Sequence, residues 1–253
     1  MHVEKYNRNA VGHMIEHYER DPKIYKTQKH INPELKQLNY TIGNDELKGM
    51  AKYKKILATP GLKIMNRADV NTMIDVVLTL PKAEYFPQER YKEFFEVGYQ
   101  FLLNKFCNNS EDTLISCTAH LDESQDGETK GQPHIHFCFA SVVETEKGLR
   151  MNASKIVTRS MLRTLHKEAS DYFYNHFGFD VGILNGATKE GNLTVPQLRE
   201  QTKRYNELLK SNEKLQNENE QLKSELAENM HNLKIWQEVE DITPCFEIDK
   251  SKE

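Results

Sequence analysis

The stretch His120–Phe139 reads HLDESQDGETKGQPHIHFCF and contains three of the ten histidines of the chain. In its second half, Pro133–Phe139, the side-chain types alternate with the two-residue period of a β-strand. Residues two apart in a strand point to the same face of a sheet, so His134 and His136 are predicted to project side by side.

A second strand is predicted just before this stretch, in the apolar run LISCTA of residues 114–119, which His120 ends. The polar, glycine-containing linker between the two strands predicts a hairpin loop. Such a hairpin places His120 beside His134 and His136. Three imidazoles around one point bind a metal ion and leave room for a substrate oxygen, as catalytic metals require. Three unrelated histidines on a half-buried sheet are the alternative, which the strand phase disfavours.

Three motifs in order resemble those of the plasmid mobilisation relaxases of the Mob/Pre (MobV) type, a branch of the HUH endonucleases. HLDE at 120–123 and PHIHF at 133–137 resemble the family's metal motif, although the loop between them is longer here. Loop insertions cost little free energy. HYER at 17–20 is similar to the first motif, His-x-x-Arg, and INPELKQLNY at 31–40 to the second. The resemblance covers residues 1–190.

The residues alone leave the nucleophile open, because His13, His17 and Tyr18 share one predicted helix and other HUH enzymes use tyrosine. The resemblance implies that His17 attacks the DNA. Arg20 lies three residues later on the same helix face, which suits a group that holds a phosphate oxygen. Glu123 is expected either to bind the metal or to hold His17 in one tautomer, and Asp122 is the weaker candidate.

The resemblance further implies a metal-dependent, site- and strand-specific nicking and rejoining of plasmid DNA at a transfer origin, in a single-stranded or hairpin region. The intermediate would be a covalent 5′-phosphohistidine, used for conjugative mobilisation or plasmid recombination. It implies manganese or magnesium, whereas three imidazoles by themselves suggest zinc. Two other functions fit the same residues: a three-histidine metallohydrolase that activates water, and a non-enzymatic dimeric DNA-binding protein.

DNA binding has to depend on a local patch, because the chain carries a net charge of −4. The best basic cluster contains Lys48, Lys52 and Lys55, with Arg67 following, although a solvated helix face would look the same. Tyr40 ends the second motif and is predicted to contact or position DNA. We also expect a bacterial cytoplasmic protein, because the cysteines lack a pairing pattern and no apolar run suits a membrane span or signal sequence.

The last part of the chain differs in kind from the rest. Residues 198–236 follow a seven-residue repeat, with Leu208, Leu215 and Leu222 at one core position and Asn212 and Asn219 at the other. This pattern predicts a coiled coil that forms a parallel homodimer. A single amphipathic helix packed on the front domain is the alternative. We therefore divide the chain into a relaxase domain (1–190), a coiled-coil dimerisation arm (191–240) and a tail (241–253).

The predicted fold class is α+β. An antiparallel sheet of the HUH-relaxase type carries the histidines on one face, with helices packed on the other. Helices are expected over residues 9–20, 44–57, 87–106 and 154–176, and further strands over residues 1–6 and 74–80.

Overall fold

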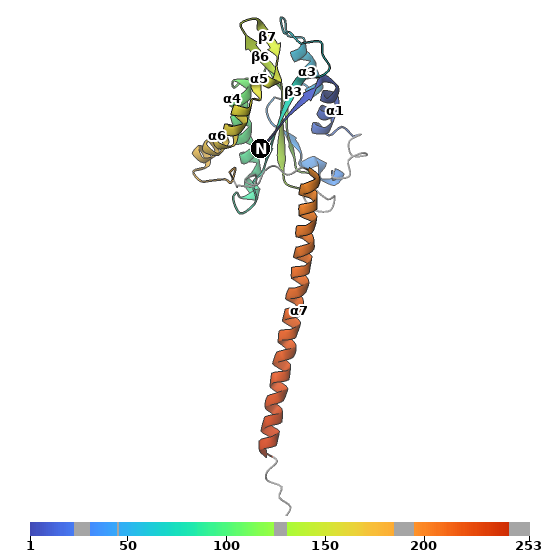
Figure 1. Ribbon diagram of the computed structural model, residues 1–253, viewed down its shortest axis with the longest axis vertical. Helices are drawn as coiled ribbons and strands as arrows, with labels where there is room; N and C mark the ends of the chain where they lie inside the picture. Colours follow the sequence, from blue (N-terminus) through green and yellow to red (C-terminus); the bar gives the residue numbers. More distant parts are fainter. Residues whose placement is uncertain (23–30, 45, 124–130, 185–194, 243–253) are drawn as a thin grey trace, which may run out of the picture. The chain divides into compact units, whose positions relative to one another are not determined.

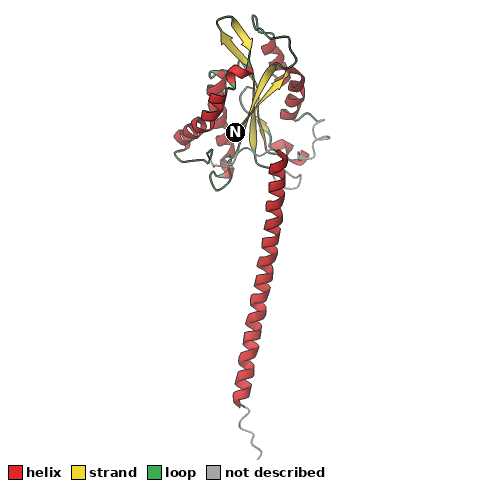
Figure 2. Ribbon diagram, viewed as in Figure 1, coloured by secondary structure: helices red, strands yellow, loops and turns green. Residues whose placement is uncertain are grey.

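The computed structural model describes residues 1–22, 31–44, 46–123, 131–184 and 195–242. It divides the chain into two compact units, residues 1–189 and 190–253. Among the described residues, no helix is long and apolar enough to cross a membrane. The three histidines of the hairpin belong to the first unit, whose elements are drawn in Figures 1 and 2.

The first unit is built on a five-stranded sheet of order β1-β3-β5-β4-β2, in which every neighbouring pair is antiparallel. The strand with the paired histidines, β5, is the central one. It forms from an almost uninterrupted apolar run, as a strand buried on both faces does. The five strands are β1 (His2–Asn7), β2 (Tyr40–Thr41), β3 (Asn71–Thr79), β4 (Leu114–His120) and β5 (His134–Ala140).

The predicted hairpin is the β4–β5 pair. His120 stands opposite His134, and Thr118 stands opposite His136. On the other side of β5, Val77 of β3 pairs with His136. This register puts the three histidines on one face of the sheet, because side chains alternate between faces along each strand.

Helices cover both faces of this sheet, not only the face opposite the histidines (Figure 1). The helices α4 (Tyr91–Cys107) and α6 (Arg159–Phe177) bury their aromatic side chains on the far face. On the histidine face, α1 (Arg8–Tyr18) and α3 (Gly49–Leu57) pack Ile15 and Tyr53 against the sheet. This second helical layer is what brings the HYER motif to the histidines.

Three predicted helices differ from those in the structure. The predicted helix 9–20 ends at Tyr18, so Arg20 lies beyond it and not on a helix face shared with His17. The predicted helix 154–176 is two helices, α5 (Ala153–Ile156) and α6, because the side chain of Thr158 accepts a hydrogen bond from the backbone nitrogen of Met161 and starts a new helix. The predicted helix 44–57 begins only at Gly49. The remaining elements are the short helices η1 (Pro33–Leu38) and η2 (Gln88–Arg90) and the hairpin of β6 (Val142–Thr145) and β7 (Gly148–Met151).

The second unit contains one long helix, α7 (Val195–Ile242). The leucines of its seven-residue repeat, Leu208, Leu215 and Leu222, are exposed on its surface. The coiled coil and the dimer remain predictions.

Candidate functional site

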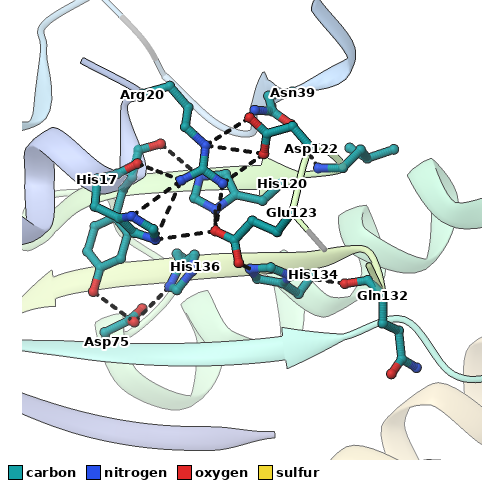
Figure 3. Close-up of polar contacts among 12 residues, drawn as sticks. His17, Arg20, Asn39, Asp75, His120, Asp122, Glu123, Gln132, His134 and His136 are labelled. Carbon is teal, nitrogen blue, oxygen red and sulfur yellow. Dashed lines mark hydrogen bonds and ion pairs between the residues drawn. The ribbon is translucent and has the colours of Figure 1, made fainter. Parts of the chain in front are cut away.

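The three histidines of the hairpin lie around one point (Figure 3). Their ring centroids are 4.9 Å apart for His120 and His136, 5.1 Å for His134 and His136, and 5.4 Å for His120 and His134. This is the arrangement expected of three side chains from facing positions on paired strands.

Each of the three rings is held through one nitrogen, which fixes its tautomer. His120 donates from Nε2 to the carbonyl oxygen of Tyr18 at 2.9 Å, and His134 donates from Nδ1 to the carbonyl oxygen of Gln132 at 3.1 Å. His136 donates from Nδ1 to the buried carboxylate of Asp75 at 2.8 Å. Metal-binding histidines are oriented by outer acceptors of this kind, which leave the other nitrogen with a lone pair.

Burial keeps these rings in the form that binds metals. It lowers the pKa of His120 well below the ordinary histidine value and lowers the pKa of His134 as well, against the opposing effect of Glu123. Neutral imidazole is the ligand form. The inner nitrogen of His120, Nδ1, is buried and has no hydrogen-bond partner among the described residues. A buried polar atom of this kind fits a metal ligand, because leaving it unpaired costs free energy.

The carboxylate of Glu123 lies among the imidazoles. Its oxygens are 3.3 Å from His17 Nε2, 3.4 Å from His120 Nδ1 and 3.6 Å from His134 Nε2. Burial alone would raise the pKa of Glu123, but the close approach of the His120 and His17 rings lowers it far below the ordinary value. Glu123 is therefore a permanent negative charge at the centre of the site.

The nucleophile candidate His17 joins this cluster from the last turn of α1. Its ring centroid is 5.6 Å from that of His120 and 5.8 Å from that of His136. One ligand atom from each of His17, His120, Glu123 and His136 lies within 4.8 Å of the others. This set shares two residues with the predicted trio and replaces His134 by His17 and Glu123.

Tyr18, the rival nucleophile, points the other way. It is fully buried, and its hydroxyl donates to Asp75 at 2.9 Å. Burial raises the pKa of Tyr18 far above the ordinary tyrosine value, and the nearby Cys138 and Asp75 add to this. Its ring packs 4.4 Å from that of His136. Tyr18 thus supports His136, whereas His13, one helical turn before His17, is exposed.

Arg20 is engaged by carboxylates in the structure. Its Nη2 is 2.7 Å from Asp122 and 2.6 Å from Glu123, and Nη1 donates to the carbonyl oxygen of His17 at 3.0 Å. Burial lowers the pKa of Arg20, but its hydrogen bonds and ion pairs with Asp122 and Glu123 raise it overall. Arg20 adopts a left-handed backbone with φ of 54° just after α1, which turns its side chain back to the site.

Asp75 is the functional candidate that the sequence reading missed. Besides His136 and Tyr18, it accepts a hydrogen bond from Cys138 Sγ at 3.3 Å, and the residue is 2% exposed. The signal was present, because Asp75 is the one charged residue in the apolar run of β3, NTMIDVVLT. A buried charge in a central strand needs partners, which points to a site.

Of the five residues predicted to bind DNA, Tyr40, Lys48 and Lys52 line one cavity, and Lys55 and Arg67 lie outside it. The cavity lies between α1, α3 and β4, and Lys55 is exposed farther along α3. Arg67 is exposed and forms an ion pair with Asp69. The ring of Tyr40 lies 6.4 Å from Tyr91 of α4, toward the far face of the sheet. DNA binding by these five residues remains a prediction.

The solved structures that resemble this chain have one fold. A Mn-bound MobM relaxase domain (MOBV; Mob_Pre) in complex with a 22-nucleotide oriT DNA of plasmid pMV158 bearing a 3′ thiophosphate aligns with a TM-score of 0.57 and 22% identity. The alignment covers 79% of this chain and 96% of that one. The same domain bound to a 26-nucleotide oriT DNA aligns with a TM-score of 0.53 and 17% identity, over 78% of this chain and 97% of that one. Similarity at this level of identity establishes the fold.

The sequence itself gives the family. A search of curated proteins found no match. The family model Mob_Pre, described as plasmid recombination enzyme, matches residues 1–200, which include every residue of the site described above. The chain therefore belongs to the Mob_Pre family of plasmid recombination enzymes.

Proposed function

We propose that the protein is a DNA relaxase that nicks and rejoins one strand of plasmid DNA at a transfer origin through a covalent 5′-phosphohistidine intermediate on His17. One observation carries the proposal. His17 lies within ring contact of His120 and His136, so a nucleophile and a metal-binding set occupy the same cluster. The only tyrosine of α1 is buried against Asp75 and cannot reach a phosphate without leaving the core.

The residues present fit a divalent cation. His120, His134 and His136 would hold it through Nδ1, Nε2 and Nε2, because their other nitrogens are engaged by Tyr18, Gln132 and Asp75. The MobM relaxase domain in the similar structures is Mn-bound, which supports manganese here, and magnesium is the alternative. When bound, a divalent ion at these residues would supply Lewis-acid polarisation of the scissile phosphate.

The chemical step belongs to His17. When Nε2–H of the neutral ring donates to Glu123, Nδ1 keeps its lone pair and attacks phosphorus in line. The nitrogen–phosphorus bond forms as the bond from phosphorus to the 3′ oxygen breaks, and that oxygen leaves as a 3′ hydroxyl after taking up a proton. The reverse reaction rejoins the strand without a nucleotide cofactor, because the bond energy is kept in the phosphoramidate.

Arg20 and Glu123 position the nucleophile. Arg20 binds Glu123, Asp122 and the backbone of His17, so it fixes the end of α1 against the loop after β4. Glu123 then holds one nitrogen of His17. Arg20 could bind a phosphate oxygen only if Glu123 turned away from it, toward the metal site. Glu123 would therefore become a metal ligand only when the DNA is bound.

We also propose that α7 forms a parallel dimeric coiled coil with a second copy of the chain. Its leucine stripe is exposed in the described chain, and burying it would remove apolar surface from water. The enzyme would work where plasmid DNA is found, in the bacterial cytoplasm.

The test is incubation of the protein with supercoiled plasmid carrying the origin of its own replicon, with Mn²⁺ or with a chelator. We expect Mn²⁺-dependent nicking and a protein–DNA adduct that survives denaturation. The adduct should break down in mild acid, because protonation turns the phosphoramidate imidazole into a better leaving group. An enzyme that only activates water would nick without leaving an adduct.

Two matched variants identify the nucleophile. His17→Ala is expected to remove both nicking and adduct, whereas Tyr18→Phe, which keeps the ring and loses only the hydroxyl, should still form the adduct. An acid-stable adduct that persists in His17→Ala and disappears in Tyr18→Phe would refute the assignment.

A further inference from the structure

A cavity of about 210 Å³ lies beside the histidine site, between α1, α3 and β4. It is on the histidine face, because Ser116 and Thr118 project from β4 on the same side as His120. Its volume is below the roughly 300–1,000 Å³ of pockets for drug-sized ligands. The cavity therefore suits one small group.

Two residues that line this cavity, Ser116 and Asn39, have buried polar atoms without partners in the described part of the chain. Ser116 is only 6% exposed, and its Oγ makes no hydrogen bond within the described part of the chain. The buried Nδ2 of Asn39 is also without a partner there, although its Oδ1 accepts from the backbone nitrogen of Leu121. Buried polar groups in folded proteins almost always have partners, so two unpaired ones at a single cavity indicate a polar ligand.

The charge at the mouth gives the class of ligand. Lys48, Lys52 and Glu19 line the cavity; the Glu19 carboxylate accepts from the backbone nitrogen of Gly49, and the Lys52 ammonium donates to the carbonyl oxygen of Asn44. Lysines at the mouth suit a phosphodiester. Leu47 and Ile115 offer apolar contact to a flat ring, and the hydroxyl and amide groups inside suit the hydrogen-bonding edge of a base.

The cavity is close enough to the chemistry to take the neighbouring nucleotide. Thr118 precedes the metal-site candidate His120 by two residues, roughly 6.6 Å along a strand. Arg20 and Asn39, which both line the cavity, lie at the border of the histidine cluster in Figure 3. One nucleotide of an unstacked strand spans such a distance.

We propose that this cavity takes the base of a nucleotide next to the scissile phosphate, turned out of the strand. Ser116, Thr118 and Asn39 read its edge, and Lys48 and Lys52 bind the flanking phosphate. The proposal rests on the proposed function, because it requires single-stranded origin DNA at His17.

The experiment is an abasic scan. Single-stranded origin oligonucleotides, each lacking one base near the nick, are titrated with the full-length protein in chelator, and fluorescence anisotropy gives each Kd. For the wild type, removing one base beside the scissile phosphate should weaken binding about tenfold, which is ~1.4 kcal/mol. In Ser116→Ala, the intact oligonucleotide should bind as weakly as that abasic one, with no further loss when the base is removed.

A second variant blocks the cavity from its rim. Leu47 is 44% exposed, so Leu47→Trp can be accommodated by the fold and should also erase the sensitivity at that position. The matched control is Leu162→Trp on α6, where the leucine is 43% exposed on the far side of the sheet and the abasic profile should stay as in the wild type.

Nicking with Mn²⁺ is measured in parallel, to separate this proposal from the function it rests on. A wild-type protein that nicks and forms the adduct but has a flat abasic profile overturns the cavity proposal alone. An unchanged profile in both Ser116→Ala and Leu47→Trp, or a uniform loss of affinity at every position, overturns it as well. A wild-type protein that neither binds nor nicks its origin strand overturns both.

Discussion

Asp75→Asn is expected to weaken Mn²⁺ binding 10- to 100-fold, although Asp75 touches no metal itself. The Asp75 carboxylate accepts from His136 Nδ1 at 2.8 Å and from Tyr18 at 2.9 Å, and this keeps His136 Nε2 free as a ligand atom. The substitution keeps the shape of the side chain and removes its charge. It therefore tests orientation and charge rather than packing.

The magnitude follows from the hydrogen bonds. With its amide oxygen toward His136, the substituted side chain keeps both bonds, but they change from charge-assisted to neutral, from about 1.5–3 to about 0.5–1.5 kcal/mol. A loss of ~1–1.5 kcal/mol corresponds to about tenfold in affinity. With its amide nitrogen toward His136, the same side chain would donate to Nδ1 and place the ring proton on Nε2, the atom proposed to bind the metal. This orientation accounts for the upper end of the 10- to 100-fold range.

The assay is calorimetric titration of Mn²⁺ into the metal-free protein, with thermal melting as the check on folding. Asp69→Asn is the matched control, because Asp69 is an exposed carboxylate paired with Arg67. Tyr18→Phe removes one of the donors to Asp75 and should have a smaller effect than Asp75→Asn. Wild-type Mn²⁺ affinity in a folded Asp75→Asn protein would refute this reasoning.

Three more predictions concern the site, the arm and the pH dependence. His134→Ala or His136→Ala is expected to abolish nicking in the plasmid assay while largely sparing DNA affinity, because binding depends on phosphate contacts spread over the surface. Parallel loss of both would mean that the histidines hold the fold. Ending the chain after Gly191 should give a folded protein that still nicks and that sediments as a monomer, since the site residues all lie in residues 1–189. An insoluble or inactive product would contradict this. In metal-free protein, stability should fall as the pH drops below 6.5, because burial lowers the pKa of His120 and His134 and the unfolded chain then binds protons that the folded chain does not. Each ring contributes up to ~1.4 kcal/mol per pH unit to the slope of the unfolding free energy against pH. Urea unfolding of His134→Asn between pH 7 and 5 should therefore give a shallower slope than the wild type. An equal slope would exclude His134 as a source of the pH dependence.

Much of the fold could be read from periodicity. The hairpin of β4 and β5, the strand β3 and the helices α1 and α4 follow from local patterns, because strand and helix periods leave a direct trace in the sequence. The break between α5 and α6 could not be read this way. It depends on Thr158 capping a new helix in the middle of a stretch whose apolar spacing suits one continuous helix.

The placement of single side chains was harder to predict. Tyr40 pairs with Ala119 in the sheet, and its ring approaches Tyr91 toward the far face, contacts that its motif did not indicate; its role at the DNA remains a prediction. Arg20 pairs with Asp122 and Glu123, which follow it by about a hundred residues, and its contact with a phosphate remains a prediction. A helical spacing of three predicts a shared face and says nothing about distant partners.

The sequence by itself determined which residue types could carry the chemistry, and it placed His134 and His136 on one face, because the two-residue period of a strand is a local property. Only the tertiary structure decided that β3 lies beside β5, so that Asp75 meets His136, and that α1 lies on the histidine face, so that His17 meets His120. Those contacts join segments far apart in the chain and depend on strand order and on which face a helix covers. The free energy that selects them is the burial of apolar side chains throughout the sheet, which no single motif contains.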